Sequence, residues 1–296
     1  MFDVVVIGSG PAGYVAAIRA SQLGLKTLCI EELSNDKGKP NFGGTCLNVG
    51  CIPSKSLLDS SHRYYEAKKN LSDHGIQLGD VKLDLKTMME RKDNIVSKLT
   101  GGIDGLFLTN KVESVCGKGK VISKNIVQID KADGSSEKVD AKNIIIATGS
   151  SPIEIPAASF GKHIVDSTGA LAFDSVPKRL GVVGAGIIGL ELGSVWSRLG
   201  SEVTVLEALE DFLPMTDTDI SKESFKEFKE QGLDIQLASK VTFTKELKNS
   251  VKVKYEHKGK EIEIEFDKLI VAVGRKPNSD KVCLLYTSPS PRDDIS

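Results

Sequence analysis

The chain has 296 residues and a nearly balanced charge, with 39 lysines and arginines against 40 aspartates and glutamates. This length favours two domains with separate cores, and the balanced charge argues against a nucleic-acid or anionic-membrane partner. No apolar run approaches the roughly 20 residues of a membrane-spanning helix, and the first residues do not resemble a signal peptide. We therefore expect a cytoplasmic protein whose mature chain begins at residue 1.

Residues 3–31 predict a strand, a glycine-rich turn, a helix and a second strand. The turn GSGPAG directly follows an apolar run, and the second strand ends in Glu31, 23 residues after Gly8 (31 − 8 = 23). This is the dinucleotide-binding fingerprint in its proper context. Gly8 permits the tight turn, Gly10 lets backbone N–H groups approach a pyrophosphate, and Gly13 lets the helix pack closely on the strand. The acid can accept hydrogen bonds from ribose hydroxyls, whereas an ordinary buried helix would leave it unexplained.

The stretch GGTCLNVGCIPSK at 43–55 holds Cys46 and Cys51, five positions apart. Five cysteines in so long a chain do not form a secreted disulfide framework, so a close pair is more typical of catalysis or metal binding. The spacing suits zinc, but the nearby histidines lack the spacing of further ligands, and we expect no metal. In a regular helix the two residues would rise about 7.5 Å, beyond the roughly 4.4 to 6.8 Å between disulfide Cα atoms. A disulfide here therefore requires an irregular backbone, which Gly50 and the paired glycines before Cys46 permit.

A second fingerprint lies at 179–207. Its glycines stand at 184, 186 and 189, and Glu207 ends the following strand, again 23 residues after the first glycine (207 − 184 = 23). Chance repetition at identical spacing is improbable. The chain is therefore expected to hold two dinucleotide-binding folds.

Each predicted fold carries additional strands. Residues 112–139 predict a small antiparallel meander, and 251–266 predict a hairpin. The join is expected at 150–156, where two prolines interrupt any helical pattern. We therefore predict an α/β fold with two Rossmann-like domains in series, 1–150 and 151–282, each with a small antiparallel β-meander.

A redox role explains the cysteine pair better than a structural one. The cysteine pair is close to Lys55 and near the start of a predicted helix. The positive charge and the helix dipole there favour a thiolate. A reducible pair between two nucleotide-binding folds predicts electron transfer between a dithiol, the disulfide, a flavin and a nicotinamide. A buried structural role stays open for either thiol alone, and it is the interpretation we prefer for Cys29 and Cys116.

Together, GGTCLNVGCIPSK, the two fingerprints, IIIATGS and IVAVGRKPN resemble the pyridine nucleotide-disulphide oxidoreductases. The resemblance covers about residues 1–282 and is closest to the branch that oxidises dihydrolipoamide. It implies FAD in the first domain, NAD in the second, and a lipoylated protein of a 2-oxoacid dehydrogenase or glycine cleavage complex as partner. The implied flavin contacts are Gly8, Gly10, Gly13, Glu31, Lys55, Thr148, Gly149 and Ser150, with Gly117 or Gly119. The implied NAD contacts are Gly184, Gly186, Gly189, Glu191, Glu207, Val241 and Gly274.

The resemblance also implies roles for the redox residues. The dihydrolipoyl dithiol would attack Cys46, and Cys51 would lie against the flavin and pass the electrons on as a thiolate. Lys55 and Glu191 resemble the family's ion pair beside the flavin N5. The simpler interpretations are a solvated lysine and an ordinary acid on a helix surface.

Other branches of the family differ at single positions. Glutathione-type reductases use NADP and carry arginines where this chain reads VLEALED, and Glu207 would repel a 2′-phosphate. Transhydrogenases of this fold lack the cysteine pair. Mercuric reductase shares the pair and stays open as an alternative, although its usual N-terminal metal-binding module is missing here.

The resemblance stops near Val282. The family continues with a second flavin-contacting segment and a C-terminal dimerisation domain, which carries a His and Glu acid–base pair, so the full-length parent is expected to be a homodimer. Residues 283–296 read CLLYTSPSPRDDIS, which we interpret as an artefactual or disordered tail outside the family pattern. None of the four histidines has the expected spacing, so no catalytic base is named. A second hypothesis is therefore a non-catalytic nucleotide-binding fragment.

Overall fold

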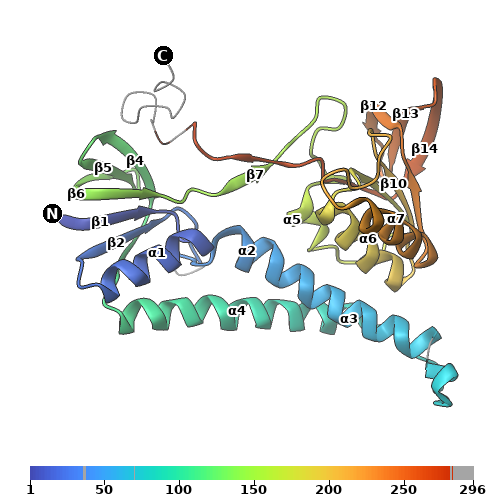
Figure 1. The fold of residues 1–296 in the computed structure, drawn as a ribbon, viewed down its shortest axis with the longest axis horizontal. Helices are drawn as coiled ribbons and strands as arrows, with labels where there is room; N and C mark the ends of the chain where they lie inside the picture. Colours follow the sequence, from blue (N-terminus) through green and yellow to red (C-terminus); the bar gives the residue numbers. More distant parts are fainter. Residues whose placement is uncertain (36–37, 70, 281, 283–296) are drawn as a thin grey trace. The chain divides into compact units, whose positions relative to one another are not determined.

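A computed structural model describes residues 1–35, 38–69, 71–280 and 282 (Figure 1). The chain forms two compact units. Among the described residues, the first unit holds 1–35, 38–52, 95–151, 276–280 and 282, and the second holds 53–69, 71–94 and 152–275. The predicted tail at 283–296 lies outside the described residues.

The first unit is built on a six-stranded sheet with the order β3-β2-β1-β6-β5-β4. Four neighbouring strands are parallel, namely β3 (Glu113–Cys116), β2 (Thr27–Glu31), β1 (Phe2–Ile7) and the second half of β6 (Ser136–Ile146). The first half of β6 pairs antiparallel with β5 (Ile126–Asp130), which pairs with β4 (Lys118–Ser123). One long strand therefore joins the parallel sheet to the predicted meander.

The two faces of β1 pack into different cores, as the alternation of a strand requires. Val4 and Val6 lie in one apolar cluster with residues of α1 (Pro11–Gln22) and α4 (Leu85–Thr109). Val5 and Ile7 lie in the other, with residues of β2 and the meander. Because β1 is covered on both faces, its run of apolar residues has no polar alternation.

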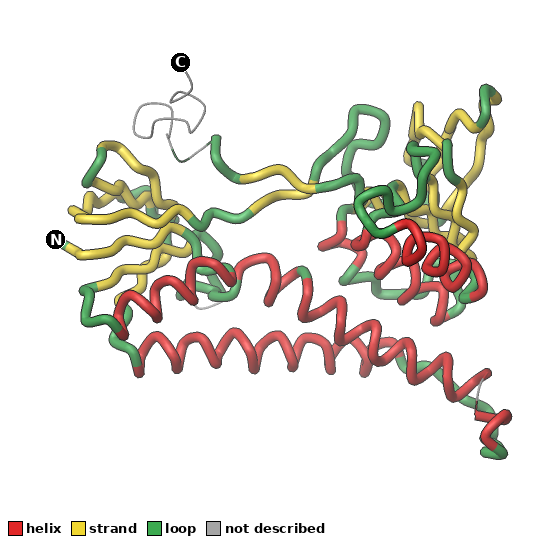
Figure 2. Tube along the Cα trace, viewed as in Figure 1, coloured by secondary structure: helices red, strands yellow, loops and turns green. Residues whose placement is uncertain are grey.

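The second unit has a five-stranded parallel sheet and a separate three-stranded antiparallel sheet (Figure 2, strands in yellow). The parallel order is β11 (Leu233–Gln236), β10 (Glu202–Leu206), β9 (Arg179–Val183), β15 (Lys268–Val271) and β8 (Ile164–Val165). The antiparallel order is β12 (Ser239–Glu246), β13 (Val251–His257) and β14 (Lys260–Phe266). The predicted fold class, two Rossmann-like sheets each with a small meander, is thus confirmed.

The remaining elements complete the two units. The fully buried Trp196 of α6 (Ile187–Leu199) lies in the core of the second unit. No helix in the described part of the chain is both long and apolar enough to cross a membrane. The other elements are α2 (Gly44–Val49), α3 (Cys51–Lys69), η1 (Leu71–His74), β7 (Ser150–Pro152), α5 (Ser167–Ala170), α6 (Ile187–Leu199), α7 (Thr218–Glu230) and β16 (Arg275–Pro277).

The units differ from a simple series of residues 1–150 and 151–282. The chain passes from one unit to the other within α3 and again within α4, so 53–94 belong to the second unit. The last described residues, 276–280 and 282, belong to the first. The assignment of each range to one nucleotide stays a prediction.

The carboxylate of Asp267, which directly precedes β15, is hydrogen-bonded to the first residue of β9. Asp267 accepts from the backbone N–H of Arg179 at 3.0 Å and from its guanidinium at 3.1 Å. Burial alone would raise the pKa of Asp267, but these donors outweigh it and hold the pKa below its usual value. The contribution to stability is therefore present above about pH 4 and is lost as the pH falls through the folded pKa.

We expect Asp267→Asn to lower the free energy of unfolding by about 1 kcal/mol at pH 7, because a charge-assisted bond is replaced by a neutral one. The difference from wild type should shrink as the pH falls below about 4. Urea unfolding at a series of pH values measures it, with Asp234→Asn, at an exposed position of β11, as the control. A difference that is constant with pH would contradict the assignment.

Candidate functional site

The first glycines of the two fingerprints adopt the same backbone conformation, with a positive φ angle. Gly8 has φ +98° and Gly184 has φ +100°, a region that disfavours residues with a side chain. A Cβ atom at Gly8 would lie 2.3 Å from the carbonyl oxygen of Ala147, and one at Gly184 would lie 2.6 Å from that of Ala272. Both positions therefore require glycine, as the sequence predicted.

The third glycine of each fingerprint allows close packing of helix on loop. A Cβ atom at Gly13 would lie 1.8 Å from the carbonyl oxygen of Gly8, and one at Gly189 would lie 2.2 Å from that of Gly184. No side chain fits at these distances. The helices α1 and α6 therefore begin directly above their glycine turns.

The middle glycines are different, because little of the protein lies against them. Gly10 and Gly186 are the N-cap residues of α1 and α6. A Cβ atom at Gly186 would meet nothing within 4 Å, and one at Gly10 would meet only the Cα of Gly44, at 3.8 Å. Each helix thus presents its first backbone N–H groups over an open glycine, which suits a phosphate-bearing group.

The acids at the ends of β2 and β10 are tied to the same loops. Glu31 Oε2 accepts from the N–H of Ser9 at 2.9 Å, and Glu207 Oε2 accepts from the N–H of Ala185 at 2.7 Å. The other oxygen of each acid accepts from the backbone N–H two residues later, at 2.8 Å and 2.9 Å respectively. Each acid therefore first shapes its loop, and its remaining lone pairs are available for a ribose.

The cysteine segment begins against the first glycine loop. Gly43, with φ +102°, is the N-cap of α2 and donates its N–H to the carbonyl oxygen of Ser9 at 3.0 Å. A Cβ atom at Gly44 would lie only 2.6 Å from the Cα of Gly10. This close approach requires glycine at position 44, and it fixes the helix that carries Cys46 beside the loop.

The backbone is irregular between the two cysteines, as predicted. The helix α2 ends at Val49, Gly50 has φ −141° and ψ −114°, and α3 begins at Cys51. A Cβ atom at Gly50 would lie 2.8 Å from the carbonyl oxygen of Thr45 and 3.3 Å from the Cα of Cys46. The chain therefore turns back onto the segment that carries the first cysteine. Cys46 is half-buried and Cys51 is exposed.

Asn48 holds this segment together and was missed from the sequence. Its side-chain amide donates to the carbonyl oxygens of Phe42 and Gly44, both at 3.0 Å. Its own oxygen accepts from the Asn41 side chain at 3.0 Å. The only signal in the sequence was its position between the two cysteines.

The ion pair expected of Lys55 and Glu191 is present within the second unit. Lys55 Nζ lies 2.7 Å and 2.9 Å from the two carboxylate oxygens of Glu191, and Ser54 Oγ donates to Oε2 at 3.3 Å. The Lys55 side chain is 58% exposed and that of Glu191 is 24% exposed. The carboxylate is thus bound on both oxygens, while the placement of the pair beside a flavin stays a prediction.

The turn at 148–150 is held by a residue that sequence reasoning did not select, Asn278. Thr148 Oγ1 donates to the backbone oxygen of Asn278 at 2.8 Å, and the Asn278 side chain donates back to the oxygen of Thr148 at 3.0 Å. The N–H of Asn278 also donates to the oxygen of Gly149 at 2.9 Å. All of these residues belong to the first unit.

Three other predicted contact residues, Gly117, Gly119 and Val241, are packed against other parts of the protein. A Cβ atom at Gly117 would lie 2.7 Å from Ile129 Cγ2, and one at Gly119 would lie 2.9 Å from Ile7 Cγ2. Val241 is 7% exposed and packs in the core of the second unit. Gly274 is more open, since a Cβ there would meet only Ile153 Cδ1, at 3.5 Å. All four residues stay predicted cofactor contacts. Any contact from Gly117, Gly119 or Val241 would come from the backbone.

Two other thiols have raised pKa values. Burial, and then the nearby Glu31 carboxylate, raise the pKa of the Cys29 thiol to about 12. The same two causes raise the pKa of Cys116. A raised pKa disfavours the thiolate, which supports the structural interpretation of both.

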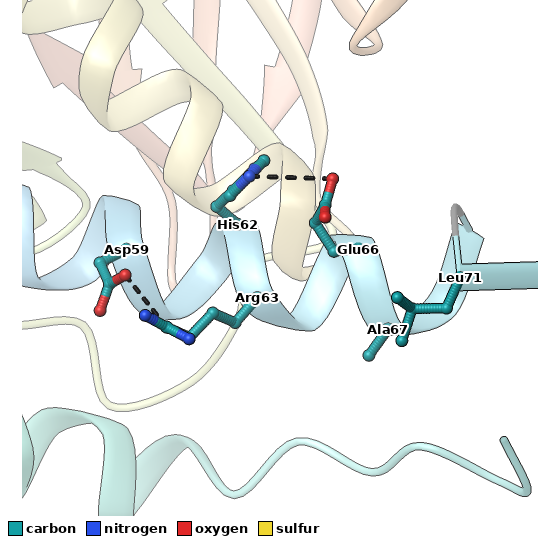
Figure 3. A pocket seen from close by; sticks show the side chains of 6 residues that line it. All are labelled: Asp59, His62, Arg63, Glu66, Ala67 and Leu71. Carbon is teal, nitrogen blue, oxygen red and sulfur yellow. Dashed lines mark hydrogen bonds and ion pairs between the residues drawn. The ribbon is translucent and has the colours of Figure 1, made fainter. Parts of the chain in front are cut away.

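The histidines all belong to the second unit, whereas the cysteine pair belongs to the first. His62 lies in an open groove along α3, 3.8 Å from the carboxylate of Glu66, with Asp59, Arg63, Ala67 and Leu71 as the other lining residues (Figure 3). His257 Nδ1 lies 2.8 Å from Ser239 Oγ. Within the described ranges, no group of three or more His, Cys, Asp or Glu side chains is arranged to hold a metal.

The pyridine nucleotide-disulphide oxidoreductase family matches residues 2–287. The chain belongs to this family. FAD and NAD are the cofactors that the family uses.

Relatives of known function are similar over almost all of this chain. It is 52% identical to dihydrolipoyl dehydrogenase of Cupriavidus necator, over 96% of this chain and 60% of that protein. It is 51% identical to leghemoglobin reductase of Vigna unguiculata, over 93% of this chain and 52% of that one. The mitochondrial dihydrolipoyl dehydrogenase of Bos taurus is 49% identical, with 93% and 54% covered.

A solved structure is similar in fold. The Cu(II) complex of the HOCl-induced flavoprotein disulfide reductase RclA of Escherichia coli has a TM-score of 0.82 at 26% identity. It covers 98% of this chain and 61% of the RclA chain. The present chain therefore spans about 60% or less of the length of the proteins it matches.

The glycine geometry predicts two opposite outcomes in one loop. Gly189→Ala places a Cβ against the backbone of Gly184, so we expect it to destabilise the second unit by about 1–3 kcal/mol or more. Gly186→Ala has room for its Cβ and should change the free energy of unfolding by no more than about 0.5 kcal/mol.

The same methyl group at Gly186 stands where a pyrophosphate would approach, so NAD binding should weaken about tenfold or more. Thermal unfolding and calorimetric titration with NAD separate the two effects. Equal unfolding of the two variants, or wild-type NAD binding by Gly186→Ala, would contradict this account of the loop.

Proposed function

We propose that this chain is the nucleotide-binding part of a dihydrolipoyl dehydrogenase. The reaction is the oxidation of a dihydrolipoyl dithiol to its disulfide, with reduction of NAD⁺ to NADH and release of one proton. The dithiol loses two electrons and two protons, of which NAD⁺ takes both electrons and one proton. The identity of 48–52% to several dihydrolipoyl dehydrogenases supports this class over the mercuric and glutathione-type reductases.

The observation that carries the proposal is the contact between the cysteine segment and the first glycine loop. Gly43 donates to Ser9, and Gly44 lies against Gly10, within one compact unit. A nucleotide cofactor on that loop would therefore be bound by the same unit that carries Cys46 and Cys51. A metal or purely structural role for the cysteines would not require this arrangement.

The residues of the first loop fit FAD. Gly10 is open, α1 directs its N-terminus at the loop, and Glu31 retains lone pairs for a ribose. We infer that Gly8, Gly13 and the turn at 148–150 complete this site. When bound, FAD supplies a two-electron carrier between the cysteines and NAD.

The second loop is proposed to bind NAD. Gly186 is open over the N-terminus of α6, and Glu207 closes the loop as Glu31 closes the first. A carboxylate at this position accepts from ribose hydroxyls and repels a 2′-phosphate. NAD is therefore favoured over NADP.

The cysteines are proposed to exchange disulfides with the substrate. One sulfur of the dithiol attacks Cys46, the Cys46–Cys51 bond breaks, and a mixed disulfide forms. The second substrate sulfur then displaces Cys46, which leaves two reduced cysteines and the lipoyl disulfide. In this order Cys51 is the thiol that passes electrons onward.

The partners and the location follow from the same class. We infer a lipoylated protein of a 2-oxoacid dehydrogenase or glycine cleavage complex as substrate, and a homodimer as the form of the full-length protein. The cytoplasmic location stays a prediction, and several of the similar dihydrolipoyl dehydrogenases are mitochondrial.

A second candidate is nucleotide binding by this chain without turnover. It is favoured by one observation, that no histidine belongs to the unit that holds the cysteine pair. Attack by the dithiol needs a group that removes its proton. Steady-state turnover of dihydrolipoamide distinguishes the two candidates, because a chain that binds FAD without a base would turn over slowly or not at all.

The proposal predicts a flavin spectrum that depends on Cys51. The purified chain should take up FAD, and anaerobic addition of two electrons should produce a long-wavelength absorbance band from a thiolate beside the flavin. Cys51→Ser should lack this band, and Cys116→Ser should retain it. Failure to take up FAD, or a band that persists in Cys51→Ser, would sink the proposal.

The break at Gly50 predicts a second effect. Gly50→Ala should slow closure of the Cys46–Cys51 disulfide about tenfold or more, because its Cβ would press on Thr45 and Cys46. Thiol titration during oxidation measures the rate. Gly101→Ala, in a part of α4 where a Cβ meets nothing within 4 Å, is the matched control and should close at the wild-type rate.

A further inference from the structure

The residue after the first glycine differs between the two glycine loops. It is Ser9 in the first loop and Ala185 in the second. Both residues donate a backbone N–H to the acid 22 positions later. Only Ser9 adds a side-chain bond, from its hydroxyl to Glu31 Oε2 at 2.5 Å.

Ser9 is fully buried, and its polar groups contact two different segments. Its N–H and hydroxyl both donate to Glu31, while its carbonyl oxygen accepts from the N–H of Gly43. A buried hydroxyl on a charged acceptor is one of the stronger hydrogen bonds in proteins. The residue therefore joins the loop, the acid and the start of the cysteine segment.

Because of this extra hydrogen bond, the Glu31 carboxylate is more constrained than that of Glu207. Glu31 accepts three hydrogen bonds and is 6% exposed, whereas Glu207 accepts two in the described structure and is only half-buried. A carboxylate with fixed donors loses less rotamer freedom when it binds a ligand. The first loop is thus more preorganised than the second.

We propose that Ser9 is a positioning residue that holds the Glu31 carboxylate ready for the ribose of the nucleotide on the first loop. This inference rests on the function proposed above, with FAD as that nucleotide. It predicts that the first loop holds its nucleotide more tightly than the second loop would without such a hydroxyl. The hydroxyl acts through Glu31 and does not itself need to touch the ligand.

The test measures FAD affinity of the full chain by quenching of flavin fluorescence. Ser9→Ala should raise the FAD dissociation constant about tenfold. Glu31→Gln should also raise it. The double variant should be little worse than the weaker-binding single variant, because the hydroxyl acts through the acid.

A matched control separates positioning from loss of a buried hydrogen bond. Ser201 is also buried and donates its hydroxyl to the carbonyl oxygen of Pro177 at 2.6 Å, in the second unit. Ser201→Ala should lower the melting temperature to a similar extent as Ser9→Ala. Its FAD dissociation constant should stay within about twofold of wild type.

The reverse substitution tests the inference even if Ser9→Ala fails to fold. Ala185→Ser introduces the same hydroxyl beside Glu207 and should lower the NAD dissociation constant about threefold. Wild-type or weaker NAD binding by Ala185→Ser, wild-type FAD binding by Ser9→Ala, or additive losses in the double variant would overturn the inference. A wild-type chain that takes up no FAD would overturn the proposed function and this inference with it.

Discussion

The backbone contact between Gly10 and Gly44 is the constraint on which the rest of the site depends. A side chain at position 44 does not fit, since a Cβ at Gly44 would lie 2.6 Å from the Cα of Gly10. The cysteine segment therefore begins on the open middle glycine of the first loop. The first loop and the helix that carries Cys46 are consequently held together by contact between their backbones.

The second loop repeats the first in backbone geometry but not in surroundings. The φ values of the first glycines, Gly8 and Gly184, are +98° and +100°, and the acids accept from equivalent N–H groups. Among the described residues, none lies against Gly186 as Gly44 lies against Gly10, and a Cβ at Gly186 would meet nothing within 4 Å. The first loop is thus in contact with the cysteine segment, whereas the middle glycine of the second loop is open.

The sequence predicted the features that depend on local spacing. The strand, glycine turn, helix and acid of both fingerprints could be found because their physical reasons act within about 30 residues of chain. The break at Gly50 could be inferred because a regular helix cannot bring residues 46 and 51 close enough. The ion pair of Lys55 and Glu191 came only from the family resemblance, since nothing local links positions so far apart.

What the sequence could not show depends on contacts between distant segments. Asn278 and Thr148 are 130 positions apart, so their mutual hydrogen bonds have no local pattern. Ser9 is not marked by any local pattern, because the residues it bonds to, Glu31 and Gly43, belong to other segments. The compact units also could not be read from the sequence as a series, because the chain crosses from one unit to the other in the first turn of α3 and again in the middle of α4.

The most direct test of the central claim is the redox state of Cys46 and Cys51 under NADH, with and without FAD. The chain would be oxidised, freed of oxidant and incubated anaerobically with NADH, and the two cysteines would be located by differential alkylation and peptide mapping. We predict a Cys46–Cys51 disulfide that NADH reduces only in the FAD-loaded chain. A disulfide that forms between other cysteines, or one that NADH leaves intact in the presence of FAD, would contradict the account.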